Sequence, residues 1–171
     1  MKELFASLNT SNPFATPYVV DTLNYRIEQE EQSSRLYHAM SMWLNDNGYF
    51  GAAKEWQKYS EEELSHAKWA KDYLLALGVQ PAIPALPKPT QVFTGLLDVV
   101  RKSHKHEILI TQQCNDMAKT SLKNGDFLLH QLALKYLSEQ VEEMEKLQDL
   151  IDRLQIAGED KAAILLIDKE L

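Results

Sequence analysis

Apolar residues recur along this chain at steps of three and four, which is the spacing of one buried face on an α-helix. The pattern predicts four long helices, each ending at or just before a glycine that favours a helix end. Their expected ranges are residues 19–47, 49–77, 94–125 and 126–157. A shorter apolar segment, KAAILLIDKEL, begins at Lys161 and predicts a fifth helix. The expected fold class is therefore all-α.

The connections between these helices indicate how they are arranged. Asn-Gly pairs at 47–48 and 124–125 predict tight turns, so the first two helices should be antiparallel neighbours, as should the third and fourth. The link between the second and third helices carries four prolines within residues 81–89, which makes it stiff and extended. About 15 extended residues reach roughly 45–50 Å, the length of a long helix. We therefore expect a four-helix bundle of two antiparallel hairpins joined by a long crossover.

Composition and charge indicate how the chain is divided into domains, which partners it excludes and where the protein is located. Residues 1–18 are rich in Ser, Asn, Thr and Pro and are expected to form an N-terminal extended arm, followed by one domain over residues 19–171. The net charge of −7 argues against a nucleic-acid partner, because phosphate contacts need a basic surface. No stretch approaches the ~18 apolar residues of a membrane helix, and the N-terminus does not read as a signal peptide. With a single cysteine, Cys114, the expected location is the reducing cytoplasm.

Polar residues interrupt the apolar face of every long helix near its middle. Glu30, Glu63, Glu107 and Glu143 stand where buried residues are expected, and His66 follows one turn after Glu63. A buried carboxylate must find a partner or shift its pKa, and no apolar face offers Lys or Arg at this level. Two metal ions would neutralise the group, and glutamates with a Glu-x-x-His pair are the ligands of di-iron helix bundles. Carboxylates with one imidazole suit iron or manganese, with zinc as a competitor.

The polar positions repeat between the two halves of the chain. Counting from Glu30, polar residues lie 33 and 36 positions later, and counting from Glu107 they again lie 33 and 36 positions later. Two equivalent helical hairpins that face each other would produce this spacing. The four later positions are Glu63, His66, Gln140 and Glu143.

Five stretches of the chain resemble bacterial non-haem ferritins: EQSSRLYHAMSMW, AAKEWQKYSEEELSHA, HKHEILITQQ, SEQVEEMEKL and LLIDKEL. The resemblance implies a cage of 24 subunits that stores iron. Each subunit would oxidise Fe(II) to Fe(III) at an intrasubunit di-iron ferroxidase centre, using O₂ or peroxide, and ferric oxyhydroxide mineral would be deposited inside the cage. The expected partners are therefore Fe(II), the oxidant and further copies of the chain.

The resemblance also implies roles for individual residues. Glu30, Glu63 and His66 would bind the first iron, and Glu63 would bridge to a second iron held also by Glu107. Gln140 would lie beside the centre. Tyr37 would lie near it and supply an electron or a hydrogen bond, the alternative being a core tyrosine satisfied by a neighbour. A third iron site would use Glu62, Glu139, Glu142 and Glu143.

Alternatives follow from the same residues. Glu62, Glu139 and Glu142 could be solvated surface charges, with Lys58 and Lys146 as neighbours on the helices. A di-iron peroxidase or oxygenase-like bundle would need no cage, and a non-catalytic helical bundle would need no metal. The fifth helix favours the cage, because its apolar face is expected to have no core to fill in a lone bundle and suggests packing at a symmetry axis.

No haem is expected, because the chain departs from haem-containing bacterioferritins at two positions. Those proteins carry a haem-binding methionine directly after the second-helix glutamate, and here that residue is Leu64. They also carry a second Glu-x-x-His on the fourth helix, which here reads Gln140-x-x-Glu143.

Overall fold

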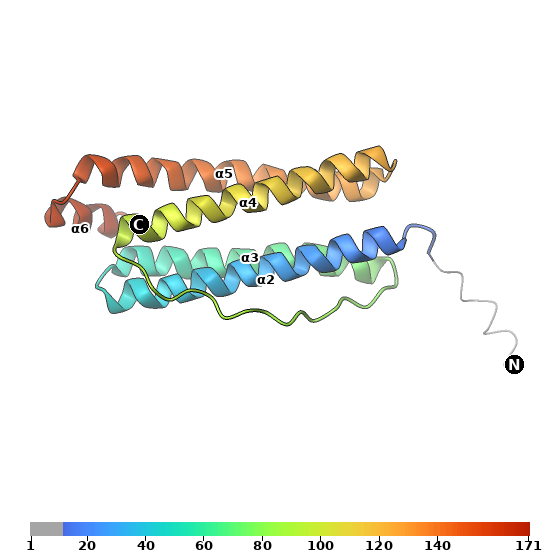
Figure 1. Ribbon diagram of the computed structural model, residues 1–171, viewed down its shortest axis with the longest axis horizontal. Coiled ribbons are helices and arrows are strands. Elements are labelled where there is room, and N and C mark those ends of the chain that lie inside the picture. The colour runs from blue at the N-terminus through green and yellow to red at the C-terminus, as the bar shows by residue number, and fades with distance from the viewer. Residues whose placement is uncertain (1–11) are drawn as a thin grey trace, which may run out of the picture.

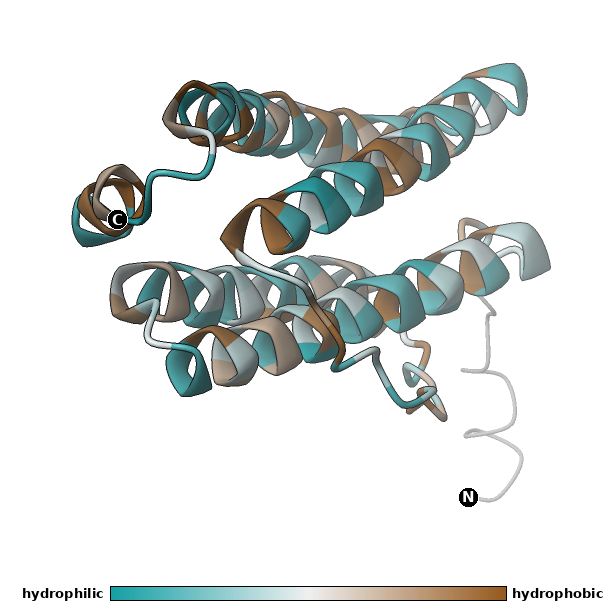
Figure 2. Ribbon diagram, turned by 60° about the vertical axis from the view of Figure 1, so that its left-hand side comes forward, coloured by the Kyte–Doolittle hydropathy of each residue, from teal (hydrophilic) through white to brown (hydrophobic). Residues whose placement is uncertain are grey.

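The protein is a bundle of two helical hairpins with a short fifth helix at one end (Figure 1). The computed structural model describes residues 12–171, and these residues contain no β-strand. Figure 2 shows the hairpins as two layers, with hydrophobic and hydrophilic residues interspersed along each helix. The expected all-α four-helix bundle with a fifth helix is confirmed. Its helices are α2 (Pro17–Asp46), α3 (Phe50–Ala76), α4 (Leu96–Lys123), α5 (Phe127–Ala157) and α6 (Lys161–Lys169).

Helix α2 begins two residues before its expected start. The Thr16 hydroxyl accepts a hydrogen bond from the Val19 amide (3.3 Å), which satisfies one free donor of the first turn. Pro17 occupies the first helical position, where its missing N–H costs nothing. Most of the predicted N-terminal arm, residues 1–11, lies outside the described residues.

The crossover between α3 and α4 runs alongside α2 for the length of the bundle, as the green segment of Figure 1 shows. Two hydrogen bonds join it to α2. The Ala82 amide donates to Asn24 Oδ1 (2.9 Å), and Arg35 Nη1 donates to the Leu86 carbonyl (3.5 Å). Helices α3 and α4 therefore begin at the same end of the bundle, as the length of this link predicted.

The two hairpin turns depend on glycine. Gly48 and Gly125 adopt φ angles of 85° and 71°, a left-handed region that glycine enters without a steric penalty. Directly after Gly125, the Asp126 carboxylate accepts from the Leu129 amide (2.9 Å) and begins α5. These turns place the members of each hairpin side by side and antiparallel.

The apolar core is divided along the bundle axis. One cluster fills the end where α2 meets α3 and includes Leu44, Trp56 and Leu154. A second cluster fills the opposite end and includes Leu23 and Leu129. A third, small cluster of Ile110, Cys114 and Tyr136 adjoins the predicted polar residues at the helix positions between these two. Burial of apolar surface therefore explains the two ends of the bundle better than its middle.

Helix α6 packs against the start of α3. The Asp168 carboxylate accepts from the amides of Gly51 (3.2 Å) and Ala52 (2.8 Å), which lie in the unpaired first turn of α3. Ile167 joins the apolar cluster at this end. The expectation that this segment has no core to fill in a lone bundle is therefore wrong, although Leu165 and Leu166 remain 53% and 64% exposed.

Candidate metal centre

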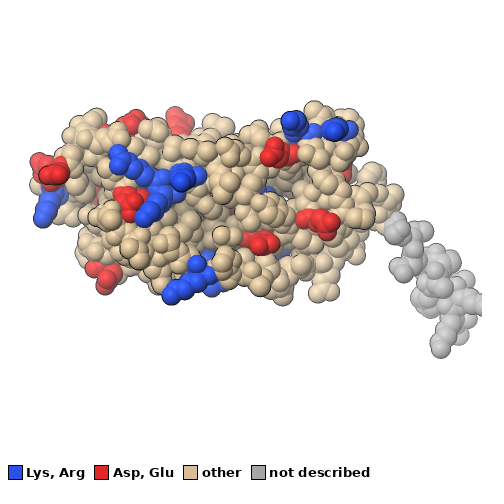
Figure 3. Space-filling model, in the orientation of Figure 1, with Lys and Arg blue, Asp and Glu red and all other residues tan. Residues whose placement is uncertain are grey.

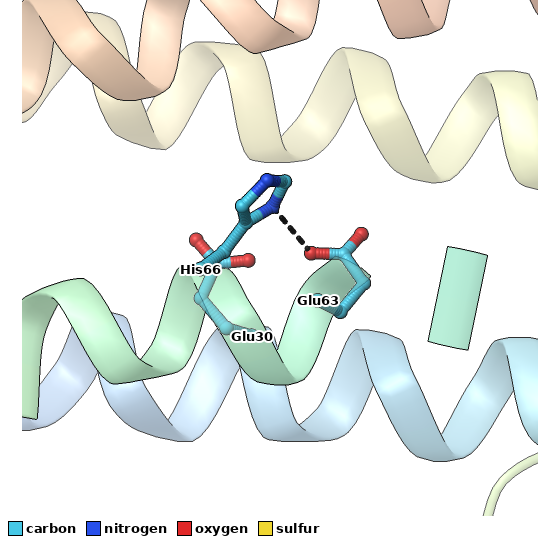
Figure 4. Close-up of side chains that lie close together, drawn as sticks. All are labelled: Glu30, Glu63 and His66. Carbon is cyan, nitrogen blue, oxygen red and sulfur yellow. Dashed lines mark hydrogen bonds and ion pairs between the residues drawn. The ribbon is translucent and has the colours of Figure 1, made fainter. Parts of the chain in front are cut away.

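Glu30 from α2 and Glu63 and His66 from α3 form a buried cluster at mid-length of the bundle (Figure 4). One potential ligand atom from each residue lies within 4.8 Å of the others. The side chains project toward the α4–α5 hairpin, and His66 Nδ1 lies 3.1 Å from Glu63 Oε2. Among residues 12–171, no other three acidic, histidine or cysteine side chains gather this closely. The structure thus brings together the three residues predicted for the first iron.

Glu107 from α4 and Glu143 from α5 form the opposite half of the centre. Gln140 lies between them, and its Nε2 donates to Glu107 Oε2 (3.0 Å) and Glu143 Oε2 (2.5 Å). The Thr111 hydroxyl lies within hydrogen-bond distance of Gln140 Oε1 (2.8 Å) and of the Glu107 carbonyl (2.7 Å). Its contact with Oε1 keeps the amide nitrogen of Gln140 facing the carboxylates. The Tyr37 hydroxyl donates to Glu107 Oε1. This half is therefore held by a chain of hydrogen bonds.

A small internal pocket lies beside the two halves, and Glu63 is common to both. Glu63 belongs to the cluster with Glu30 and His66, and it also lines the pocket with Glu107 and Glu143. A carboxylate has two oxygens, so one glutamate placed in this way can contact an ion on each side. The pocket is lined by Tyr37, Tyr59, Glu62, Glu63, Glu107, Glu143 and Leu147.

Burial raises the pKa of the four central carboxyls. Loss of solvent is the largest cause at each, and it raises the pKa of Glu30, Glu63 and Glu143 to about 8 and that of Glu107 to about 7. Neighbouring carboxylates raise the pKa values further, as Glu63 does for Glu30. The metal-free centre therefore holds protons near neutral pH, and a bound cation would displace them.

The donor set fits an oxygen-seeking metal ion. Both carboxylate oxygens of Glu30 are buried and accept no well-aligned hydrogen bond. Buried acceptors in native proteins are almost always satisfied by a protein group, a water or an ion. Carboxylate oxygens with one imidazole nitrogen are ligands that suit iron, manganese or zinc.

Arg26 is buried beside this cluster, which the apolar-face pattern did not predict. Its Nε lies 2.7 Å from Glu30 Oε1, and its side chain is 2% exposed. Its Nη1 donates to Cys114 Sγ (3.6 Å), and its guanidinium lies 5.9 Å from the centroid of the Tyr136 ring. The prediction that no Lys or Arg reaches the glutamates is wrong. The sequence did contain one indication of this contact. Arg26 precedes Glu30 by four residues, which places both side chains on one helix face.

Aromatic residues surround His66. The Tyr136 hydroxyl on α5 donates to the His66 carbonyl (2.7 Å), which ties α5 to α3 at the level of the centre. The ring centroids of Trp69 and His66 lie 4.7 Å apart, and Lys135 Nζ lies 3.5 Å from the centroid of the indole. Trp69 was not predicted at the site, although it follows His66 by one helical turn.

The three carboxylates predicted only for the third site do not gather into one cluster within the described part of the chain. Glu62 and Glu139 are half-buried and Glu142 is exposed. Glu62 Oε1 lies 3.7 Å from Lys58 Nζ, an ion pair of the kind that the surface-charge alternative predicted. Glu62 also lines the internal pocket, which is the observation that favours the third site. That site stays a prediction.

The outer surface adds two findings. Acidic and basic side chains are interspersed over the face drawn in Figure 3. None of the helices in residues 12–171 combines the length and apolar character that crossing a membrane requires.

Two antiparallel hairpins with carboxylates and a histidine buried between them define the class of helical carboxylate bundles. Known proteins identify the family within this class. Residues 20–157 match the ferritin-like domain family. The chain therefore belongs to the ferritin family, and the resemblance predicted from its motifs is confirmed.

Individual relatives match over nearly the whole chain. The chain is 34% identical over 155 residues to bacterial non-heme ferritin of Escherichia coli, covering 91% of this chain and 94% of that protein. It is 32% identical over 153 residues to a probable bacterial non-heme ferritin-like protein of Haemophilus influenzae, covering 90% and 93%. An open-pore ferritin from the archaeon Archaeoglobus fulgidus has a similar structure, with a TM-score of 0.89 and 27% identity over 92% of this chain and 96% of that one.

Proposed function

We propose that this protein stores iron: it oxidises Fe(II) between its two hairpins and deposits the ferric product inside a cage of 24 copies of the chain. The observation that carries the proposal is the position of Glu63. This carboxylate is shared between a buried Glu–His cluster and a pocket lined by two further carboxylates. Such an arrangement suits two adjacent cations better than one, because a single carboxylate can bridge them.

Two Fe(II) ions would be the substrates of the centre. Glu30, Glu63 and His66 would hold one ion, and Glu63, Glu107 and Glu143 would hold the other. Each ion loses one electron, so that two Fe(II), one O₂ and two protons give two Fe(III) and one H₂O₂. With peroxide as the oxidant, two Fe(II), one H₂O₂ and two protons give two Fe(III) and two H₂O.

The central carboxyls would supply protons as the ions bind. Because burial raises their pKa values to about 7 or 8, the group as a whole retains protons at neutral pH, and Fe(II) would displace these protons. Tyr37 would contribute from its contact with Glu107. This hydrogen bond would hold Glu107 in place at the second ion, since the two Fe(II) ions already supply both electrons of the step.

Product iron would leave through the acidic residues next to the pocket. Glu62 lines the pocket and is half-buried, so it can take an ion from Glu63 and Glu143 on its inner side. Together with Glu139 and Glu142 it would form the third iron site on the route to the cage interior.

The mass of the assembled protein in solution tests whether the chain forms a cage. Leu165 and Leu166 on α6 are exposed, and contact with neighbouring subunits would bury them. For a subunit of 19.6 kDa, 24 copies amount to about 470 kDa. Elution at about 20 or 40 kDa would contradict the cage and favour the oxygenase-like or peroxidase-like bundle.

Iron oxidation is tested by giving anaerobic Fe(II) to the metal-free protein and then admitting air. The rise in ferric absorbance should be fast for the unaltered protein and for Glu61→Ala, which removes an exposed carboxylate of the same helix. It should be slow for Glu63→Ala. Equal rates for the unaltered protein and Glu63→Ala would refute the ferroxidase proposal.

A further inference from the structure

Arg26 has no use in the scheme above, and its burial is costly. Its side chain is 2% exposed, and neither Nε nor Nη2 makes a well-aligned hydrogen bond. The contact of Nε with Glu30 Oε1 at 2.7 Å is therefore mainly electrostatic. A charged group with unsatisfied donors is expensive to bury unless its charge is compensated. The positive charge of Arg26 is thus the feature that needs an explanation.

Groups from all four long helices face this guanidinium. Glu30 lies one turn away on α2, and Glu63 on α3 belongs to the same buried cluster as Glu30. Cys114 on α4 accepts from Nη1, and the ring of Tyr136 on α5 lies beside it. The pocket that contains Glu107 and Glu143 does not include Arg26. The close contact of the guanidinium is therefore with the half of Glu30 and His66, while its charge also acts to lower the pKa of Glu107 in the other half.

We propose that Arg26 is a resident counter-ion of this half, a positioning residue that holds Glu30 while no metal is bound and competes with metal for its charge. This inference rests on the proposed function, because it concerns the same Fe(II) site. Its consequence is that an ion beside Glu30 and His66 is held more weakly than the same ligands would hold it without the guanidinium. Weak retention suits a site through which substrate iron passes.

The charge of Arg26 has opposite effects on the metal-free and the metal-bound protein. Without metal, it stabilises a buried carboxylate that would otherwise be unpaired. With metal, it repels a divalent cation bound to the same carboxylate, and this repulsion is strong because water is excluded. Removing the charge should therefore lower the melting temperature of the metal-free protein and raise its metal affinity.

The experiment measures both quantities on the same variants. Zn(II) is the probe, because it cannot be oxidised, and its binding is followed by calorimetry at fixed pH. Arg26→Gln should bind the ion of this half about tenfold more tightly or more and melt at a lower temperature without metal. Arg26→Lys, which retains a charge, should lie close to the unaltered protein. Arg101→Gln removes an exposed arginine and should change neither quantity.

A purely structural role predicts a different result. If Arg26 only orients Glu30, Arg26→Gln should have both a lower melting temperature and a lower affinity for Zn(II). That result would show that the inference is wrong. Should Arg26→Gln fail to fold, Arg26→Met keeps an unbranched apolar stem without the charge and gives the same comparison. Zn(II) binding in the unaltered protein that Glu63→Ala does not reduce would overturn the proposed function itself. Binding that Glu63→Ala abolishes and Arg26→Gln leaves unchanged would overturn only this inference.

Discussion

The two halves of the centre share one spacing and differ in how their carboxylates are neutralised. In the α2–α3 half, a buried guanidinium lies 2.7 Å from Glu30. In the α4–α5 half, Glu107 and Glu143 accept hydrogen bonds from Gln140, and no arginine of residues 12–171 forms an ion pair with either. The common spacing specifies where polar side chains meet. The charge of the carboxylates is balanced by single residues, Arg26 in one half and Gln140 in the other. Two sets of ligands with the same spacing can therefore bind a cation with different affinity.

The largest predicted effect comes from removing the residue that belongs to both halves. Glu63→Ala should lower the affinity for both Zn(II) ions by about 100-fold or more, since each loses a charged ligand. Glu30→Ala should affect mainly the ion beside His66, and Glu107→Ala mainly the other. Equilibrium dialysis counts the ions bound per subunit, with Glu61→Ala as the exposed control. Loss of one ion in all three variants would mean that the centre is not divided in this way.

A second prediction concerns the pH dependence of the metal-free protein. In these carboxyls the folded-state pKa is above the unfolded value of 4.5, so the native state binds protons more tightly. Their contribution to the free energy of unfolding is fully present below about pH 4.5 and is lost as the pH rises. For Glu107 the loss is complete near its pKa of about 7, and for Glu30 near about 8.

Urea unfolding from pH 5 to 8.5 without metal measures this loss. Stability should fall across the range, and Glu30→Gln should flatten the curve up to a higher pH than Glu107→Gln does. Saturating Zn(II) should reverse the slope, because metal binding requires deprotonated ligands. A metal-free slope that neither variant changes would show that these carboxyls do not titrate as described.

A smaller effect is expected from the hydrogen bonds of the α4–α5 half. Gln140→Leu removes two donors from buried carboxylates, and leaving such acceptors unsatisfied costs about 1–3 kcal/mol. Urea unfolding at pH 8.5, where more of these carboxyls are ionised, should show the loss. Gln148→Leu, at an exposed position of the same helix, should cost much less. Equal losses for the two variants would argue that Gln140 is not needed to balance the charge.

The smallest effect is expected at Thr111, which acts through Gln140. Thr111→Val keeps the branched shape and removes the hydroxyl that orients the amide, at a cost of about 1 kcal/mol. In the double variant with Gln140→Leu, most of this cost should disappear, because the amide is already gone. Full additivity of the two changes would show that Thr111 acts independently.

The fold could be predicted because helix periodicity and turn residues act locally. The steps of three and four placed Glu30 and Glu63 on buried faces, and the Asn-Gly pairs located the hairpin turns at Gly48 and Gly125. The gathering of Glu30, Glu63 and His66 follows from the same pattern. The roles of these residues toward iron remain predictions that the experiments above address.

Features that depend on tertiary contacts could not be predicted in this way. Arg26 lies on the same face as Glu30, yet arginine on a helix is normally placed at the surface. Only the packing of all four helices shows that its guanidinium is enclosed. Likewise, the docking of α6 depends on Asp168 meeting amides more than a hundred residues earlier, at Gly51 and Ala52.

Glu63 is predicted to join two ion positions within one subunit. Anomalous diffraction from crystals soaked in Zn(II) tests it most directly, because the method locates each ion relative to its ligands. We predict two peaks per subunit on either side of Glu63, one beside Glu30 and His66 and one beside Glu107 and Glu143. A single peak, or peaks that Glu63 does not contact, would contradict the account.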